Sequence, residues 1–214
     1  MKHTIIAAAL AISAIASAQA ASITGLNNTG LGASGSTDGS YSLKAVSDDG
    51  VTAIVPTISY DAQWPIGPWL ANTSVSKWIT PTASQSQSLD AWNAGSYTYS
   101  LAFDLTGYNA TSAAFTGRLA ADNSVVVKLN NQVISTASGF TDWTSFAANS
   151  GFVAGVNKLD FVVSNWAQNG GNPTGLRVEF AASSVAAVPE PETYAMLLGG
   201  LALLGVTARR RKAK

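Results

Sequence analysis

Residues 97–105 of the chain read YTYSLAFDL, a stretch in which large apolar side chains alternate with small or polar ones. The side chains at 97, 99, 101, 103 and 105 share one face of an extended chain, and Thr98, Ser100, Ala102 and Asp104 share the other. A period of two indicates a strand with one buried face, because successive side chains of a strand point to opposite sides. We therefore predict a β-strand over 97–105.

The same period recurs along the chain. It appears in AAFTGRLA (113–120), SVVVKL (124–129), KLDFVVS (158–164) and GLRVEFA (175–181), where Arg177 and Glu179 are expected on an exposed face. Asn130-Asn131 between SVVVKL and QVIS (132–135) predicts a hairpin, since Asn tolerates the positive φ of tight turns. Less regular strands are expected within 41–47, 51–60 and 73–80, the second interrupted by Pro56. About eight short strands predict an all-β, antiparallel β-sandwich, with a jelly roll preferred over an immunoglobulin-like order.

The first twenty residues have the layout of a secretory signal peptide. Lys2 gives a positive start, residues 4–16 are apolar, and Ala18-Gln19-Ala20 is a small-x-small cleavage pattern, so cleavage is expected between Ala20 and Ala21. A buried N-terminal helix is the alternative. Residues 21–40 are a Gly/Ser/Asn-rich lead-in, either a flexible spacer or a loop-rich start to the domain. The β-sandwich ectodomain is expected over 41–183 and a C-terminal segment over 188–214.

Composition excludes several kinds of chemistry. The chain has no cysteine, and its single histidine is His3, inside the expected signal peptide. Ser-His-Asp and Cys-His catalysis are therefore excluded, as are the usual nitrogen and sulfur ligands of zinc or copper. The acidic stretches SDDG (47–50) and ADNS (121–124) have the composition of ordinary turns and lack the spacing of a calcium loop. No metal and no cofactor are expected.

Charge also limits the partners. Between Ala21 and Ala187 the chain has six basic and ten acidic residues, a net charge of −4. The basic residues are scattered singly, whereas binding to nucleic-acid phosphates needs clustered Lys and Arg. No nucleic-acid partner is expected.

Tryptophans mark the candidate ligand-binding loops. Sugar rings pack their C–H faces on aromatic rings while amides and carboxylates bind the hydroxyls. The stretches DAQWPIGPWL (61–70) and SNWAQNGGNP (164–173) combine both features in Pro/Gly-rich loops. The candidate ligand-binding residues are Trp64, Trp69, Asn165, Trp166, Gln168 and Asn169. The alternative is that these rings plug the ends of the sandwich; Trp78, Trp92 and Trp143 are expected in the core.

The C-terminal segment combines an apolar run with a basic end. Tyr194 to Ala208 are uncharged and mostly apolar, and Arg209-Arg210-Arg211-Lys212 follow directly. As a helix these fifteen residues span roughly 22 Å, short of the roughly 30 Å hydrocarbon core of a bilayer. The pattern predicts a short transmembrane helix with its basic end in the cytoplasm; a helix packed on the domain is the alternative.

With Pro189-Glu190-Pro191 in front, this ending resembles the PEP-CTERM sorting signal of Gram-negative bacteria. The resemblance implies that Pro189, Glu190 and Pro191 form the motif recognised by a membrane-bound exosortase, and that Arg209, Arg210 and Arg211 form the cytoplasmic retention feature. It implies export through the Sec translocon and an inner-membrane precursor with a periplasmic ectodomain. The processed protein would then reach the cell surface or an extracellular matrix, often one of exopolysaccharide.

A second resemblance covers about 65 residues, from Gly117 to Phe180. The stretches GRLAADNSVVVKLNNQVI, GFVAGVNKLDFVVSNW and GGNPTGLRVEF are similar to galactose-binding-like jelly rolls, which occur as carbohydrate-binding modules. We therefore expect an exported, non-enzymatic protein that binds exopolysaccharide or another glycan. The alternatives are a structural or adhesive matrix protein without a ligand site and an enzyme that acts on carbohydrates through carboxylates.

Overall fold

The computed structural model describes residues 20–47, 50–168, 170–188 and 191–212. Most of the expected signal peptide, Ala18 included, and the motif residues Pro189 and Glu190 lie outside this range. The strands are β1 (Ala20–Ala21), β2 (Ser42–Val46), β3 (Thr52–Ala53), β4 (Thr57–Ile58), β5 (Ile79–Thr80), β6 (Gly95–Asp104), β7 (Tyr108–Leu129), β8 (Gln132–Ala148), β9 (Val156–Asn165) and β10 (Gly175–Ala187). One helix, α2 (Pro191–Lys212), follows them.

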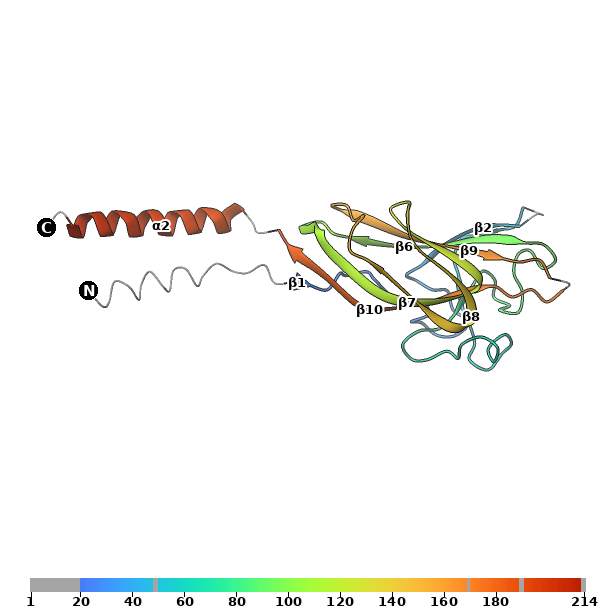
Figure 1. Cartoon of the computed structure of the whole chain (residues 1–214). Coiled ribbons are helices and arrows are strands. Elements are labelled where there is room, and N and C mark those ends of the chain that lie inside the picture. The colour runs from blue at the N-terminus through green and yellow to red at the C-terminus, as the bar shows by residue number, and fades with distance from the viewer. Residues whose placement is uncertain (1–19, 48–49, 169, 189–190, 213–214) are drawn as a thin grey trace.

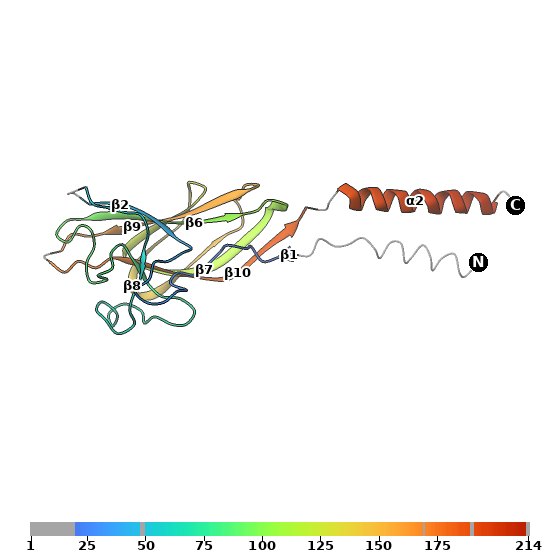
Figure 2. The same cartoon turned by 180° about the vertical axis from the view of Figure 1, so that it is seen from behind.

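The strands form a single curled antiparallel sheet. Its order is β3-β2-β6-β9-β7-β10-β5-β4, with β1 on β10 and β8 on β7. Every strand pair is antiparallel, so the prediction of an antiparallel all-β fold is confirmed. The sheet folds over on itself to give the two layers seen in Figures 1 and 2.

The long strand β7 joins the two layers. Along one edge, residues 108–122 pair with β10, and residues 124–129 pair with β9. The other edge pairs with β8 from Phe115 to Leu129. The change of partner falls at Asp122 and Asn123, so this pair of residues marks the corner where β7 passes from one layer to the other.

The core lies between the layers and is built by the inward faces of the alternating strands. Tyr97, Tyr99, Leu101, Phe103 and Leu105 are all buried, as the period of two predicts. They pack with inward residues of the other long strands, among them Phe115, Leu119, Val127, Leu159, Phe161, Val163, Leu176 and Val178. The aromatic rings of Phe115, Phe146, Phe161 and Phe180 meet mostly edge to face, with centroids 5.6–5.9 Å apart.

Sequence and structure differ in the length of the strands. The predicted strands 113–120 and 124–129 are parts of one strand, β7, and the predicted 132–135 strand extends to Ala148. The turn between them is as predicted: Asn130 and Asn131 have φ of 48° and 70°. The last strand also runs past residue 183 to Ala187, because Ala186 and Ala187 pair with Asn109 and Tyr108.

The lead-in over 21–40 is bound to the domain. Ala21 pairs with Val185, and Ile23 is buried in the core. Further along, the backbone N–H of Thr29 donates to the carbonyl of Val178, and Asp38 is buried with its carboxylate bound to the N–H of Gly30. The segment has little regular structure, but these contacts make it a loop-rich part of the domain.

Helix α2 leaves the domain at the end where β1 pairs with β10 (Figure 1). Its side chains from Leu198 to Arg210 are exposed, including Leu198, Leu201 and Leu203. The predicted C-terminal helix is therefore confirmed.

Within the described residues no helix is long and apolar enough to cross a membrane. The uncharged run of α2 is fifteen residues long, and the rest of the helix includes Glu192 and four basic residues.

Candidate functional site

The six tryptophans divide into two groups. Trp64, Trp92 and Trp166 are 58%, 67% and 61% exposed. Trp69 and Trp78 are buried, and Trp143 is half-buried. The expectation of a core position is confirmed for Trp78 and wrong for Trp92, which lies in the loop before β6 and outside the core.

Trp69 packs inside the domain and is no part of an open surface. The centroid of its ring lies 4.3 Å from that of Trp78, and both rings belong with Ala120 to a second apolar cluster. Each indole nitrogen has a partner: that of Trp69 donates to Oδ2 of Asp122 at 2.9 Å, and that of Trp78 donates to the carbonyl of Leu70 at 2.8 Å. The loop containing these rings covers the outward face of the sheet beside β10 and β7.

The side-chain amide of Gln85, in the loop before β6, forms hydrogen bonds with the loop that contains Trp64. Gln85 is 3% exposed, and its Oε1 accepts the backbone N–H of Tyr60 at 2.6 Å. Its Nε2 donates to the carbonyls of Tyr60 and Gln63. Gln63 directly precedes Trp64, so Gln85 fixes the backbone that presents the Trp64 ring.

The side-chain amide of Asn172, in the loop after β9, forms hydrogen bonds with the backbone on both sides of Trp92 and with the backbone of Trp166. Asn172 is 1% exposed, and its Nδ2 donates to the carbonyls of Trp166 at 3.0 Å, Asp90 at 3.2 Å and Asn93 at 3.5 Å. The Trp92 ring lies against Gly170, where an added Cβ would stand 3.1 Å from the ring. The two exposed rings therefore stand on adjoining loops that share one hydrogen-bonding centre.

These loops lie at the end of the sandwich opposite α2 (Figures 1 and 2). The loop from Trp166 to Thr174 crosses the corner of β7 and is bound to it at both ends. The backbone N–H of Trp166 donates to Oδ1 of Asn123 at 2.7 Å, and the hydroxyl of Thr174 donates to the carbonyl of Asp122. The loop is held by the strand that joins the two layers.

Asp122 is the buried charge of this corner. Its oxygens accept hydrogen bonds from Trp69 and from Nδ2 of Asn123. Burial raises its pKa from 3.8 to about 6, because removal from water disfavours the carboxylate, and the Trp69 hydrogen bond offsets only part of this effect.

Asn165, Gln168 and Asn169 are the other residues that we predicted to bind a ligand at the loop after β9. Asn165, the last residue of β9, is 1% exposed, and its Oδ1 and Nδ2 have no hydrogen-bond partner among the described residues. Gln168 is exposed, and Asn169 lies outside the described residues. An unpaired buried amide costs about 1–3 kcal/mol, so Asn165 marks a place where water or a ligand group would be stabilising.

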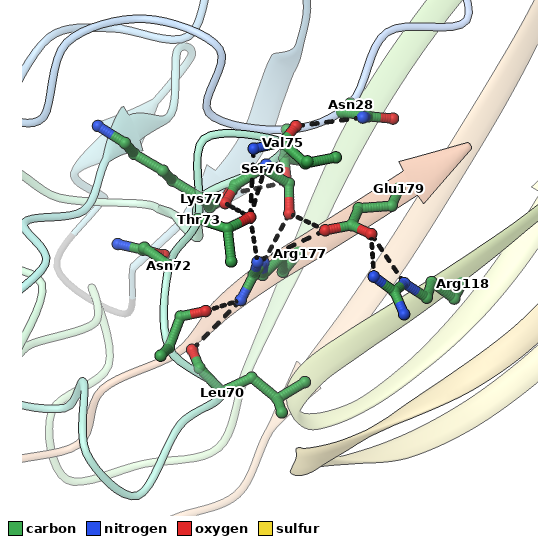
Figure 3. Close-up of polar contacts among 12 residues, drawn as sticks. Asn28, Leu70, Asn72, Thr73, Val75, Ser76, Lys77, Arg118, Arg177 and Glu179 are labelled. Atoms are coloured by element: carbon green, nitrogen blue, oxygen red, sulfur yellow. Dashed lines mark hydrogen bonds and ion pairs between the residues drawn. The ribbon is translucent and has the colours of Figure 1, made fainter. Parts of the chain in front are cut away.

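A further polar cluster lies under the 70–77 loop, on the strand face that we expected to be exposed. Arg177 and Glu179 of β10 are 1% and 6% exposed, because the loop covers them (Figure 3). Arg177 donates to the carbonyls of Leu70 and Ala71 and to the hydroxyl of Ser76.

Glu179 is the anionic centre of the cluster. It accepts from Ser76 at 2.7 Å and pairs with Arg118 at 2.5 Å and Arg177 at 3.5 Å. Burial alone would raise the pKa of Glu179, but the hydrogen bonds from Ser76 and Arg118 and the two guanidinium charges lower it overall. Burial, together with the charge of Arg118, lowers the pKa of Arg177 despite the opposing effect of Glu179. Both guanidinium groups stack on Trp143, at 4.5 and 4.8 Å from the ring.

Comparison with protein families assigns the C-terminal segment. A family model described as the PEP-CTERM protein-sorting motif matches residues 187–212. The chain carries a PEP-CTERM sorting motif. The match contains Pro189, Glu190, Pro191 and the three arginines at 209–211, so the predicted resemblance is confirmed. A PEP-CTERM motif implies an exported protein that is sorted from the membrane to the cell exterior.

The domain in front of the PEP-CTERM motif is similar to solved structures at low sequence identity. No curated protein matches the chain. A β-glucosidase from Kluyveromyces marxianus is similar over 80% of this chain with 13% identity and a TM-score of 0.40, but the chain spans only 21% of that enzyme. A PA14 sugar-binding domain from an RTX adhesin is similar over 70% of this chain and 98% of its own length, with 11% identity and a TM-score of 0.32.

A family 35 carbohydrate binding module from an environmental isolate is similar over 46% of this chain and 75% of its own length, with 17% identity and a TM-score of 0.24. Two of these three neighbours are described as carbohydrate-binding or sugar-binding domains.

Of the three exposed tryptophans, the sequence predicted Trp64 and Trp166 as ligand-binding residues but not Trp92. It also did not predict that the side-chain amides of Gln85 and Asn172 connect the loops. Trp92 stands three residues before the start of β6 at Gly95, so proximity to the strand favoured a core position. Gln85 and Asn172 lie in polar loop sequences, and nothing local distinguishes an amide that joins two loops from an exposed one.

Proposed function

We propose that the chain is an exported, non-enzymatic protein that is sorted through its C-terminal segment and binds a glycan through its tryptophan-bearing loops. The sorting step would be recognition of Pro189-Glu190-Pro191 by an exosortase, followed by release to the cell surface or an exopolysaccharide matrix. The observation that carries the binding proposal is the set of exposed rings of Trp64, Trp92 and Trp166 on loops tied together by Gln85 and Asn172.

The exposure of α2 supports the sorting role. Its leucines at 198, 201 and 203 are 66%, 51% and 70% exposed. A run of exposed apolar side chains is unfavourable in water and is typical of a segment that a partner or a membrane surface covers. A sorting enzyme at the membrane provides such cover.

The rigidity of the loops supports the binding role. The three exposed tryptophans stand on loops whose backbones are bound by buried side chains, and binding residues concentrate on loops held by a rigid scaffold. A ring held in place before binding loses little conformational entropy when a sugar stacks on it.

The environment of the carboxylates supports a non-enzymatic function. A glycoside hydrolase needs two carboxyl groups that reach the scissile bond. Asp122 has a raised pKa, as a general acid would, but it is 5% exposed and both of its oxygens are bound within the corner. Glu179 is likewise covered and bound to two arginines.

The test is a glycan array with residues 21–187. This fragment retains all residues of both core clusters, and α2 contributes to neither. We expect selective binding, with affinity lowered at least about tenfold by Trp92→Ala or Trp166→Ala, since truncation of a contact tryptophan commonly costs more than about 1.4 kcal/mol. The control is Val156→Ala, an exposed residue at the opposite end of β9 from Trp166.

Binding that is the same for all polysaccharides and unchanged by both tryptophan substitutions would favour a structural or adhesive matrix protein instead. Hydrolysis of a glycoside by the fragment would show a carbohydrate-active enzyme.

A further inference from the structure

An open groove lies on the sheet face at the junction of β10, β7 and β8, apart from the tryptophan-bearing loops. Its volume is about 480 Å³, and it is lined by Thr116, Gly117 and Arg118 of β7, Ser145 to Ala147 of β8 and Ala181 of β10. Volumes of this order accommodate one or two sugar rings. Apart from Arg118, the exposed side chains along it are small: Thr116, Ser145, Ala147 and Ala181.

A bulge in β10 accompanies the groove. The register between β10 and β7 shifts between Phe180 and Ala182, which leaves Ala181 unpaired. Opposite the bulge stands Gly117, where a Cβ would come within 2.7 Å of the carbonyl of Glu179 and 2.8 Å of the Phe146 ring. Only glycine fits there, and bulges of this kind often lie next to binding sites.

Arg118 gives the groove its chemical character. Its side chain is 50% exposed, and its Nε and Nη2 bind the same oxygen of Glu179 at 2.7 and 2.5 Å. Its third nitrogen, Nη1, points away from Glu179 in Figure 3 and has no partner among the described residues. Stacking on Trp143 at 4.5 Å fixes the plane of the guanidinium group.

The surrounding charge favours an anion. Arg118 and Arg177 are the two arginines between Ala21 and Ala187, and both meet the single carboxylate of Glu179. The cluster therefore has an excess of one positive charge in a domain of net charge −4. A guanidinium group with free N–H donors is well matched to a carboxylate.

We propose that this groove binds a carboxylate-bearing sugar residue, such as a uronate unit of an acidic polysaccharide. The carboxylate would accept from Nη1 of Arg118, and Thr116 and Ser145 would bind ring hydroxyls over the small floor of the groove. This inference deepens the proposed glycan binding but rests on different residues from Trp92 and Trp166, so the two fail separately.

The test uses trigalacturonate and its methyl ester, which has the same sugar skeleton without the charge. We expect the full chain to bind the acid at least about tenfold more tightly than the ester, and the difference to shrink at high salt. Ala147→Glu should lower affinity for the acid at least about tenfold by adding a like charge at the groove. Ala147→Gln, of the same size and neutral, should lower it less than about threefold.

Equal affinity for acid and ester would overturn the proposal, as would equal effects of Ala147→Glu and Ala147→Gln or the absence of binding to both ligands. Trp92→Ala and Trp166→Ala provide the separation. If they abolish array binding but leave the preference for acid over ester, the groove is a site of its own. If the groove variants have no effect while the tryptophan variants do, the proposed function stands and this inference falls.

Discussion

The side-chain amide of Asn172 donates a hydrogen bond to the backbone carbonyl of Trp166 at 3.0 Å, six residues earlier in the same loop. The same nitrogen reaches the carbonyls of Asp90 and Asn93, on either side of Trp92. One buried group thus fixes the backbone beneath two exposed rings. The arrangement makes the spacing of the rings a property of the folded domain rather than of a ligand.

Replacing Asn172 tests this arrangement. Asn172→Ala removes the donor to the buried carbonyl of Asp90 and to the partly buried carbonyl of Trp166, so we expect the free energy of unfolding to fall by about 1–3 kcal/mol. Glycan affinity should fall as well, although both rings remain, because the loops must then be ordered by the ligand. Urea denaturation and glycan titration of the 21–187 fragment measure the two effects. The control is Gln168→Ala, an exposed position in the same loop, which should change the free energy by less than about 0.5 kcal/mol.

The Arg177–Glu179 pair provides a prediction on stability. Glu179→Ala leaves Arg177 buried without its anionic partner, and removal of one member of a buried pair costs about 3–5 kcal/mol. We expect urea denaturation to show a loss of this order, with the 70–77 loop more open to proteolysis. Lys158→Ala breaks an ion pair with Asp160 in which the lysine side chain is 56% exposed, and it should cost less than about 1 kcal/mol. Similar losses in the two variants would contradict the buried role of Glu179.

The stretches with a period of two show how much of the fold could be predicted from the sequence. The inward faces of β6, β9 and β10 were predictable because burial of one face of a strand leaves a local period of two. The hairpin at Asn130 and Asn131 was predictable because its backbone needs residues that tolerate positive φ.

The outward face of β10 was not predictable in this way. Arg177 and Glu179 alternate with apolar residues as exposed polar residues do, and only the distant 70–77 loop makes them buried. The corner at Asp122 and Asn123 likewise depends on three strands that meet there. Contacts between segments some 50–100 residues apart leave no period in either segment, so the candidate site was only partly predictable.

The C-terminal motif gives a prediction on processing. Replacement of Pro189, Glu190 and Pro191 by alanine should leave an uncut precursor in the membrane fraction of cells that express the protein with a matching exosortase. Immunoblots of cell fractions would show this species above the processed form. Ser184→Ala, in β10 just before the motif, is the control and should be processed normally. Normal processing of the triple alanine variant would contradict recognition through this motif.

Asp122 gives a prediction on pH. Its pKa is about 6 in the folded domain and 3.8 as the ordinary value, so the folded state binds its proton more tightly than the unfolded state does. Its contribution to stability is therefore fully present below about pH 3.8 and is lost as the pH rises through about 6. A difference of roughly two pKa units corresponds to about 3 kcal/mol.

We expect the free energy of unfolding of the native sequence, relative to that of Asp122→Asn, to fall by about 2–3 kcal/mol between pH 4 and pH 7. Urea denaturation at several pH values measures this difference, in which the opposing effect of Glu179 cancels because both proteins contain it. A difference that stays constant over this range, or a carboxyl carbon of Asp122 that titrates near pH 4 by NMR, would show that the corner does not hold a buried carboxylate.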